Sequence, residues 1–393
     1  MSLHQSTEEK QYDINMMFVL FLFAVVSCFY IFQAQQLEQY EGNFMIQQII
    51  FFVLAFAIMM VVLHFDFEYY LVLHWFLYAF GLALLAGLLI APSSIAPVIN
   101  GAQSWYVIPG LGQFQPAEFM RIFLILTLSA IIYNHHTEYS GSKNMRSDFI
   151  LIGKMFLPTL PVILLLATQP DMGSVMLVGA IFVSLLVVSG ISYKILAVAI
   201  GGPLLAILGF VVSFFQFPNL MERFVFSNMD PYQVSRIQGW LNPFENQDAG
   251  FQTARALTAI GSGRLFGNDG DQVYIPEAHT DFIFAVIGSV HGFLGGAMVI
   301  TLYFVLLYQI LLISMRSHNA YGKYICAGVI GLFAFQVFQN IGQSLGLLPV
   351  TGFTLPLLSY GGSSLVGTMF ILGIVMSVRY HSKNYFFAHH KNQ

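Results

Sequence analysis

Three ionisable side chains stand directly before a long apolar run in the segment IPEAHTDFIFAVIG, residues 275–288. They are Glu277, His279 and Asp281. A carboxylate or hydroxyl at the start of a helix is stabilised by the free N–H groups there, so Thr280 or Asp281 can serve simply as a helix cap. A carboxylate that stays ionised at a helix end is also available as a general base. The spacing alone leaves a cap and a catalytic base as alternatives for Asp281.

A second polar pair lies in QPAEFMRI, where Glu118 and Arg121 are three residues apart and therefore share one helical face. Ionisable groups in a membrane-spanning segment are costly and commonly functional. The pair predicts either a self-compensating ion pair that helps the helices pack or a cationic anchor for an anionic ligand. Asp171 in TQPDMGS follows Pro170 in a tight turn, which favours a cap for the next helix.

Two segments rich in Gly and Pro complete the candidate site. Residues 100–116, NGAQSWYVIPGLGQFQP, contain Trp105, which suits either a membrane-interface aromatic or a platform that stacks on a sugar ring. Residues 347–364, LLPVTGFTLPLLSYGGSS, cannot form a regular helix throughout. Broken backbone at membrane depth is tolerated only where it is buried in protein or lines a cavity. The second segment is therefore predicted to be a re-entrant or cavity-lining element.

The composition indicates which kind of protein must position these residues. Apolar residues make up 57% of the 393-residue chain, charged residues 9%, and the mean hydropathy is +0.73. A soluble domain carries about 25% charged residues, so the chain is predicted to be a polytopic membrane protein. A net charge of −4 offers no case for nucleic-acid binding. Cys28 and Cys326 lie in apolar runs and form no disulfide or zinc pattern.

Spanning a membrane takes about 20 apolar residues, and about ten runs have suitable lengths. We therefore expect an all-α membrane domain over 1–393, with short tails at 1–12 and 381–393 on the same side. The expected spans are 14–33, 46–65, 69–91, 116–134, 149–168, 172–190, 193–217, 282–315, 322–345 and 360–380.

The basic residues predict the orientation. Loops 34–45, 92–115 and 346–359 contain no Lys or Arg, so they are expected outside and both termini in the cytoplasm. Residues 218–281, between the seventh and eighth spans, form a long extracellular loop, and loops of this length are usually functional. Its basic residues are all arginines, which hold phosphate bidentately but can equally pair with the acids of the same loop. They are Arg223, Arg236, Arg255 and Arg264.

Several stretches together resemble the SEDS family (shape, elongation, division and sporulation), and most closely its elongation branch, the RodA proteins. They occur in the family's order from about residue 100 to 365: NGAQSWY, QPAEFMRI, QPDMGS, LNPFENQDAGFQTARALTAIGSGRLFG, PEAHTDFIFAVIG and NIGQSLGLLPVTGFTLPLLSYGGSS. The resemblance implies a multi-pass protein of the bacterial cytoplasmic membrane that polymerises lipid II into peptidoglycan at its outer face. It also implies a class B penicillin-binding protein transpeptidase as partner, within the elongation machinery.

Asp281 matches the family's essential aspartate, which implies a general base that takes the proton of the acceptor GlcNAc 4-hydroxyl, with undecaprenyl diphosphate as leaving group. Trp105 matches the family's tryptophan, and Arg121 stands where the family usually has Lys. The chain departs from the family pattern at Gln103, where a basic residue is common, and at 288–292, GSVHG, where acidic residues are frequent. The residues expected to contact substrate are Ser104, Trp105, Glu118, Arg121, Asp171, Arg223, Arg236, Arg255, Arg264 and Ser363.

Cofactors and rival functions stay open at this point. Glu277, His279, Asp269 and Asp271 offer side chains that could assist a divalent cation such as Mg²⁺ or Mn²⁺, but their spacing matches no dedicated metal loop, so no metal ligand is assigned. One rival is a flippase of lipid-linked precursors, although the candidate polar groups gather on the outer side only. The other is a non-catalytic scaffold for the transpeptidase.

Overall fold

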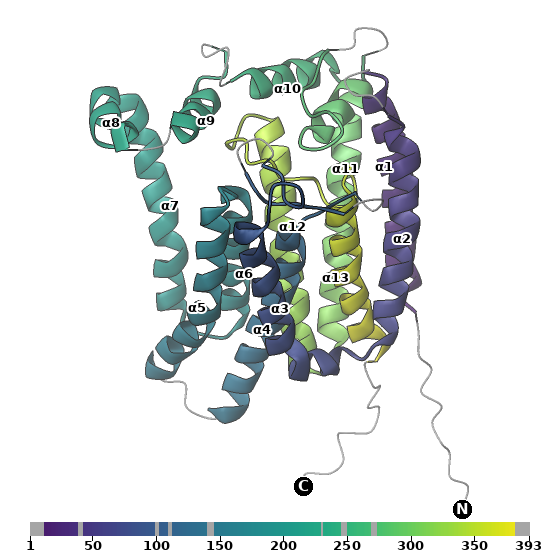
Figure 1. Ribbon diagram of the computed structural model, residues 1–393, viewed down its shortest axis with the longest axis vertical. Helices are drawn as coiled ribbons and strands as arrows, with labels where there is room; N and C mark the ends of the chain where they lie inside the picture. Colours follow the sequence, from purple (N-terminus) through teal and green to yellow (C-terminus); the bar gives the residue numbers. More distant parts are fainter. Residues whose placement is uncertain are drawn as a thin grey trace, which may run out of the picture.

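The computed structural model describes residues 12–37, 42–98, 102–108, 112–139, 145–228, 231–244, 250–268 and 273–381. Long helices, mostly running side by side, make up the body of the molecule (Figure 1). Among the described residues, nine helices are long and apolar enough to cross a membrane, and α6 is apolar but shorter. These helices agree with the expected spans. They are α1 (Ile14–Gln35), α2 (Phe44–His64), α3 (Tyr70–Ile90), α4 (Pro116–Glu138), α5 (Met145–Thr168), α6 (Met172–Val188), α7 (Tyr193–Gln216), α11 (Ile283–Arg316), α12 (Ala320–Ser344) and α13 (Gly362–Tyr380).

The start of α1 and the end of α13 lie at the same end of the bundle. The ring of Tyr12, just before α1, is 5.1 Å from the ring of Tyr380 at the end of α13 and 6.1 Å from that of His64 at the end of α2. This placement agrees with the expectation that both termini lie on the same side of the membrane. The tails 1–11 and 382–393 lie outside the described residues.

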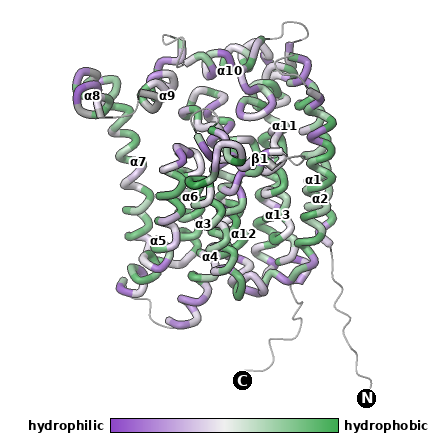
Figure 2. Tube along the Cα trace, viewed as in Figure 1, coloured by the Kyte–Doolittle hydropathy of each residue, from purple (hydrophilic) through white to green (hydrophobic). Residues whose placement is uncertain are grey.

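The connection between α7 and α11 forms short helices across the other end of the bundle, here called the loop end (Figure 1). These helices are α8 (Pro218–Phe224), η2 (Phe226–Asn228), α9 (Pro231–Leu241) and α10 (Phe251–Ser262). Polar and apolar residues alternate along them, whereas apolar residues dominate the long helices (Figure 2). A small antiparallel hairpin, β1 (Tyr106–Ile108) and β2 (Gly112–Phe114), precedes α4. The sequence did not predict this hairpin. At the opposite end, η1 (Phe67–Tyr69) links α2 to α3.

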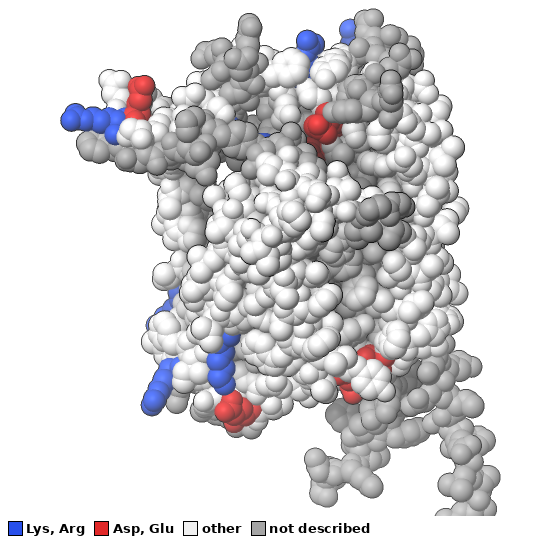
Figure 3. All heavy atoms as spheres, viewed as in Figure 1, with Lys and Arg blue, Asp and Glu red and all other residues white. Residues whose placement is uncertain are grey.

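Charged side chains are confined mainly to the two ends of the bundle on the face that Figure 3 shows. The described lysines, Lys154, Lys194 and Lys323, belong to helix starts at the end opposite the loop end. The basic residues of α8, α9 and α10 are all arginines. The positive-inside rule counts Lys and Arg together over short loops, and Arg146, Arg316 and Arg379 add to the lysines at the end opposite the loop end.

Helix α4 occupies the centre of the bundle. It contacts α3, α5, α6, α12 and α13, and most of its side chains are buried. In contrast, no described side chain of α7 is buried, and α7 contacts mainly α6 and α8. The first turns of α4 therefore carry Glu118 and Arg121 into protein rather than toward lipid.

Helix α11 is broken at Gly292, which has φ 59° and ψ −151°. The chain after α10 fills the break: Phe293 N donates to the carbonyl oxygen of Arg264 at 2.9 Å, and Leu294 N to that of Leu265 at 3.2 Å. A break at membrane depth needs such partners, because lipid offers no hydrogen bonds. The loop is thereby fixed to the helix that follows Asp281.

Candidate functional site

Asp281 lies in a tight turn that closes the long loop and leads into α11. Glu277 has a left-handed backbone (φ 48°), and its carbonyl oxygen accepts hydrogen bonds from Thr280 N at 3.2 Å and Phe282 N at 3.1 Å. The N-cap residue of α11 is Phe282, with no side-chain cap hydrogen bond. The expectation that Thr280 or Asp281 caps this helix is wrong, because the turn closes on the backbone of Glu277 before the helix begins.

The Asp281 carboxyl group is only partly exposed, and its pKa is raised from 3.8 to about 7. Burial is the largest cause, because loss of water penalises the charged form; the negative charge of Glu277 adds to it, and Arg236 opposes it. Near pH 7 the carboxyl group is therefore divided between its ionised and protonated forms. A pKa near 7 nevertheless suits a general base at neutral pH.

Two carboxamides of α12 hold the backbone of Asp281. Asn340 Nδ2 donates to its carbonyl oxygen at 2.9 Å and Gln343 Nε2 donates to the same atom at 3.1 Å. Both side chains are buried. Neither was predicted as a site residue, although a buried carboxamide in an apolar helix is a signal that the sequence contains.

The residues between α12 and α13 form the broken segment that the sequence predicts. Gly346, Gly352 and Leu357 have positive φ values, and this stretch is not helical. A Cβ atom on Gly352 would lie 3.7 Å from Oδ2 of Asp281. The Asp281 carboxylate therefore faces this segment, and Ser359 Oγ donates to the carbonyl oxygen of Thr280 at 2.6 Å.

A network of hydrogen-bonded polar side chains begins at the predicted pair on α4. Arg121 Nη1 lies 2.9 Å from Glu118 Oε2, and Arg121 Nη2 donates to Ser174 Oγ at 2.8 Å. Ser174 Oγ in turn donates to Asp171 Oδ2 at 2.6 Å, while Asp171 Oδ1 caps α6 by accepting from Ser174 N at 2.9 Å. The ion pair and the Asp171 cap are confirmed. Ser174, which joins them, was missed, although its place three residues after a cap makes it a natural partner.

Arg121 has unused hydrogen-bonding capacity. Its side chain is 4% exposed, and its Nε has no hydrogen-bond partner among the described residues. A buried guanidinium donor without a partner costs free energy. The position is therefore suited to an additional acceptor such as a phosphate oxygen.

The broken segment packs against both Asp281 and the polar network that runs from Glu118 to Asp171. Gly173, next to Ser174, packs against it so closely that a Cβ atom would lie 3.0 Å from the carbonyl oxygen of Thr351. Gly367 in α13 packs on Glu118, with 3.5 Å between its Cβ position and the Glu118 Cβ. The segment that faces Asp281 thus also packs against the start of α6, and the helix that follows it packs on Glu118.

The loop arginines occupy different places. Arg236 in α9 donates from Nη1 to the carbonyl oxygen of Val350 at 2.5 Å, and its charge acts on Asp281. Arg223, Arg255 and Arg264 are exposed, and Arg255 lies over the ring of its neighbour Phe251 at 5.4 Å. A substrate contact for these three stays a prediction. Several acids that could pair with them lie outside the described residues: Asp230, Glu245, Asp248, Asp269 and Asp271.

The remaining predicted residues, Ser104, Trp105 and Ser363, lie near the hairpin that precedes α4. Ser363 Oγ donates to the carbonyl oxygen of Gln113 at 2.7 Å and accepts from Gln115 N at 3.2 Å, so it ties α13 to the chain before α4. Ser104 is buried, and its hydroxyl has no hydrogen-bond partner in the described ranges. Trp105 is partly exposed. Their contacts with substrate stay predictions.

His279 belongs to an aromatic cluster beside the turn. Its ring stacks on Phe44 with 4.8 Å between centroids and lies 5.7 Å from the Tyr360 ring. Burial lowers the pKa of His279, although Glu277 acts in the opposite direction. The imidazole is therefore predominantly neutral at pH 7 and leaves Asp281 as the group that titrates there.

The described part of the chain contains no group of three His, Cys, Asp or Glu side chains that could hold a metal ion. Asp269 and Asp271, which were considered for a cation, lie outside it. No metal ligand is assigned among the described residues, and no chemical step below depends on a divalent cation.

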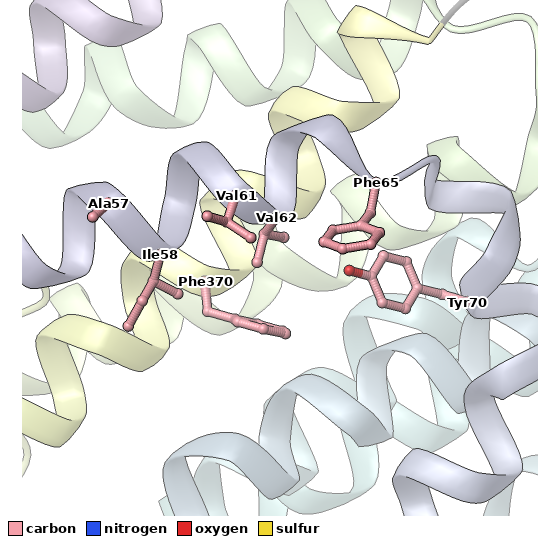
Figure 4. Close-up of a pocket in the computed structure, with 7 residues that line it drawn as sticks. All are labelled: Ala57, Ile58, Val61, Val62, Phe65, Tyr70 and Phe370. Carbon is pink, nitrogen blue, oxygen red and sulfur yellow. The ribbon is translucent and has the colours of Figure 1, made fainter.

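A separate cavity of about 530 Å³ opens between α2, α3 and α13 (Figure 4). It is lined by Ala57, Ile58, Val61, Val62, Phe65, Tyr70 and Phe370. The lining offers no charge and none of the predicted site residues. It therefore cannot contribute to binding a diphosphate.

Comparisons with known proteins agree over most of the chain. The family model FtsW/RodA/SpoVE, described as cell cycle protein, matches residues 11–384. Stage V sporulation protein E of Bacillus subtilis is 34% identical over 303 residues, which are 74% of this chain and 74% of that protein. Peptidoglycan glycosyltransferase MrdB of Escherichia coli K12 is 34% identical over 303 residues, 75% of this chain and 76% of that protein.

Solved structures show the same architecture. A peptidoglycan synthase complex, described by its structural coordination of polymerization and crosslinking, contains a chain with a TM-score of 0.75 and 27% identity, covering 95% of this chain and 99% of that one. The rod shape determining protein RodA of Thermus thermophilus has a TM-score of 0.65 and 26% identity, covering 94% of this chain and 97% of that one.

Proposed function

Because the chain belongs to the FtsW/RodA/SpoVE family of bacterial membrane enzymes, we propose that it polymerises lipid II into glycan strands at the outer face of the cytoplasmic membrane during cell elongation. The family, the multi-pass membrane location and the peptidoglycan glycosyltransferase class expected from the sequence are confirmed. The substrate, the roles of individual residues and the elongation branch are the parts that we propose.

One observation carries the proposal: a partly exposed carboxyl group with a pKa of about 7 faces the broken segment at the loop end. Perturbed carboxyl groups at such places are candidate catalytic groups. The short loops 34–45, 92–115 and 346–359 contain no Lys or Arg, which supports an outer location for this site, because cytoplasmic loops are rich in these residues.

In the proposed reaction, Asp281 acts as the general base. Its ionised carboxylate takes the proton from the acceptor GlcNAc 4-hydroxyl while that oxygen attacks the anomeric carbon of the donor sugar. The new carbon–oxygen bond forms as the bond to undecaprenyl diphosphate breaks, and the diphosphate leaves with the electron pair. The proton is then on Asp281 and passes to solvent before the next cycle.

The leaving diphosphate carries its own negative charge, so cations are more useful to it than a strong acid. Arg236 acts beside Asp281, and Arg121 contributes a buried charge with a free Nε among the described contacts. Arg121 also stays paired with Glu118. We assign both arginines to stabilising the diphosphate.

A class B penicillin-binding protein, together with other elongation proteins, is the proposed partner. The similarity to a chain of a peptidoglycan synthase complex that coordinates polymerization and crosslinking supports this partner. The likeness to a rod shape determining protein supports the elongation branch.

The decisive experiment compares purified wild type with Asp281→Asn in detergent with lipid II. We expect polymer from wild type without any membrane gradient, and a loss of at least about 100-fold in rate for the variant. Asp148→Asn is the matched control, because Asp148 lies at the opposite end, where it accepts from Ser192 N at 3.0 Å. It should retain the wild-type rate.

Two outcomes would favour the rival functions. Precursor transport across vesicles without polymer formation would identify a flippase. Normal growth and rod shape of a deletion strain carrying Asp281→Asn, with no polymer formed by the purified wild type or the variant, would identify a non-catalytic scaffold. Equal amounts of polymer from wild type and Asp281→Asn would refute only the assignment of Asp281 as the general base.

A further inference from the structure

Four buried carboxamides form a row along one face of α12. The members of this carboxamide row are Gln336, Gln339, Asn340 and Gln343, spaced by three, four and seven residues from the first, as one helical face requires. Each is at most 4% exposed. Polar groups in a membrane-spanning helix are costly unless they form hydrogen bonds.

Three members hold the broken segment to α12. Gln336 Nε2 donates to the carbonyl oxygen of Thr354 at 3.1 Å, and Gln339 Nε2 donates to that of Pro349 at 2.9 Å. Asn340 Nδ2 donates to the carbonyl oxygen of Phe353 at 2.6 Å. These bonds replace those that a helix would form within this segment.

Gln343 makes a different set of contacts, because both ends of its carboxamide are used. Its Nε2 donates to the carbonyl oxygen of Asp281 at 3.1 Å. Its Oε1 accepts from Thr351 N at 3.0 Å and from Thr351 Oγ1 at 3.2 Å. One side chain therefore joins the residue before Gly352 to Asp281, whose Oδ2 lies 3.7 Å from the Cβ position of Gly352.

We propose that Gln343 is a positioning residue for Asp281, holding the carboxylate at a set distance from the backbone at Thr351 and Gly352. The inference rests on the proposed function, in which Asp281 is the base. Gly352 is suited to this contact, because its φ of 74° favours glycine and a side chain would narrow the space beside the carboxylate. Asn340 supports the same carbonyl oxygen but does not reach Thr351.

The test uses the full-length protein in detergent and measures kcat and KM for lipid II polymerisation together with the thermal unfolding midpoint. Gln343→Met removes all three hydrogen bonds at nearly constant volume. Gln343→Glu keeps the oxygen that accepts from Thr351 and, in its ionised form, has no donor for the carbonyl oxygen of Asp281. Gln339→Met is the matched control, since it breaks a hydrogen bond to the same segment at Pro349 without touching Asp281.

Misplacement of a catalytic group by about 1 Å costs roughly 100-fold in rate. We therefore expect Gln343→Met and Gln343→Glu to lower kcat by roughly 10- to 100-fold with KM within about threefold, and Gln339→Met to keep kcat within about threefold. If Gln343→Met does not fold, Gln343→Glu alone decides. A Gln343→Glu enzyme with wild-type kcat would overturn the proposal. Gln343 would then serve only to hold the broken segment to α12.

Equal losses of kcat in Gln343→Glu and Gln339→Met would also overturn it. Asp281→Asn, measured beside them, separates this proposal from the one on which it rests. If Asp281→Asn keeps full activity, the base assignment fails and the positioning role fails with it. If Asp281→Asn is inactive while Gln343→Glu has wild-type kcat, only the positioning role fails.

Discussion

The raised pKa of Asp281 predicts a specific pH dependence for polymerisation. A shift from 3.8 to about 7 corresponds to about 4 kcal/mol in favour of the protonated form. Because the base must be ionised, kcat/KM should rise with pH, reach half of its maximum near pH 7 and level off above about pH 8. At pH 6 only about a tenth of the enzyme carries the ionised base, since each unit below the pKa costs tenfold.

Glu277→Gln tests the cause of this shift. The negative charge of Glu277 is the second contribution after burial, so its removal should lower the pKa of Asp281. A change of roughly one unit, usual for a close charge, would raise the ionised fraction at pH 6 from about a tenth to about a half. The rate at pH 6 should then rise roughly fivefold, with little change at pH 8. Gln keeps an oxygen that can accept the hydrogen bond from Thr280 Oγ1, so the turn is preserved.

The assay is the initial rate of glycan formation at lipid II concentrations well below KM, which reports kcat/KM and hence the free enzyme, between pH 5.5 and 8.5. Glu222→Gln is the control, because Glu222 lies in the same loop on α8, is exposed, and does not contribute to the pKa of Asp281. Its profile should match wild type. A Glu277→Gln profile that stays in place or moves to higher pH would refute this account of the site.

Three further changes have defined directions. Arg236→Gln removes the cation that lowers the pKa of Asp281, so the rise of kcat/KM should move to higher pH in the same assay. Glu118→Gln leaves the buried charge of Arg121 without its partner and should destabilise the protein by about 3–5 kcal/mol. The loss of stability should be smaller in the double variant Glu118→Gln/Arg121→Met, and thermal unfolding measures both. Asp281→Asn should raise the thermal unfolding midpoint at pH 8 but not at pH 4. The pKa of Asp281 is higher in the folded than in the unfolded state, so Asp281 contributes stability at low pH that is lost as the pH rises through about 7.

The parts of the site that depend on neighbours in the sequence were predictable. Glu118 and Arg121 form an ion pair because residues three apart on a helix are always adjacent. Asp171 caps α6 because a cap bonds only to the first turn of its own helix. The broken segment followed from its glycines and prolines, which no regular helix accommodates.

Contacts between distant elements were not predictable from spacing. Four loop arginines looked equivalent, and the route of α9 alone places Arg236 beside Asp281. Gln343 and Asp281 are 62 residues apart, and their hydrogen bond exists only because α12 ends where α11 begins. The capping prediction for Asp281 failed because the chain turned on Glu277 first, a route that depends on packing against the segment after α12.

The sequence by itself determined the membrane class, the positions of the long helices and the residues able to do chemistry, because apolar run length and polar residue type act locally. Only the tertiary structure decided how those residues behave. It buried Asp281 beside Glu277 and Arg236, which raised its pKa to about 7, and it joined Arg121 to Asp171 through Ser174. Burial and charge proximity are properties of the packed molecule, since they depend on which elements meet rather than on their order in the chain.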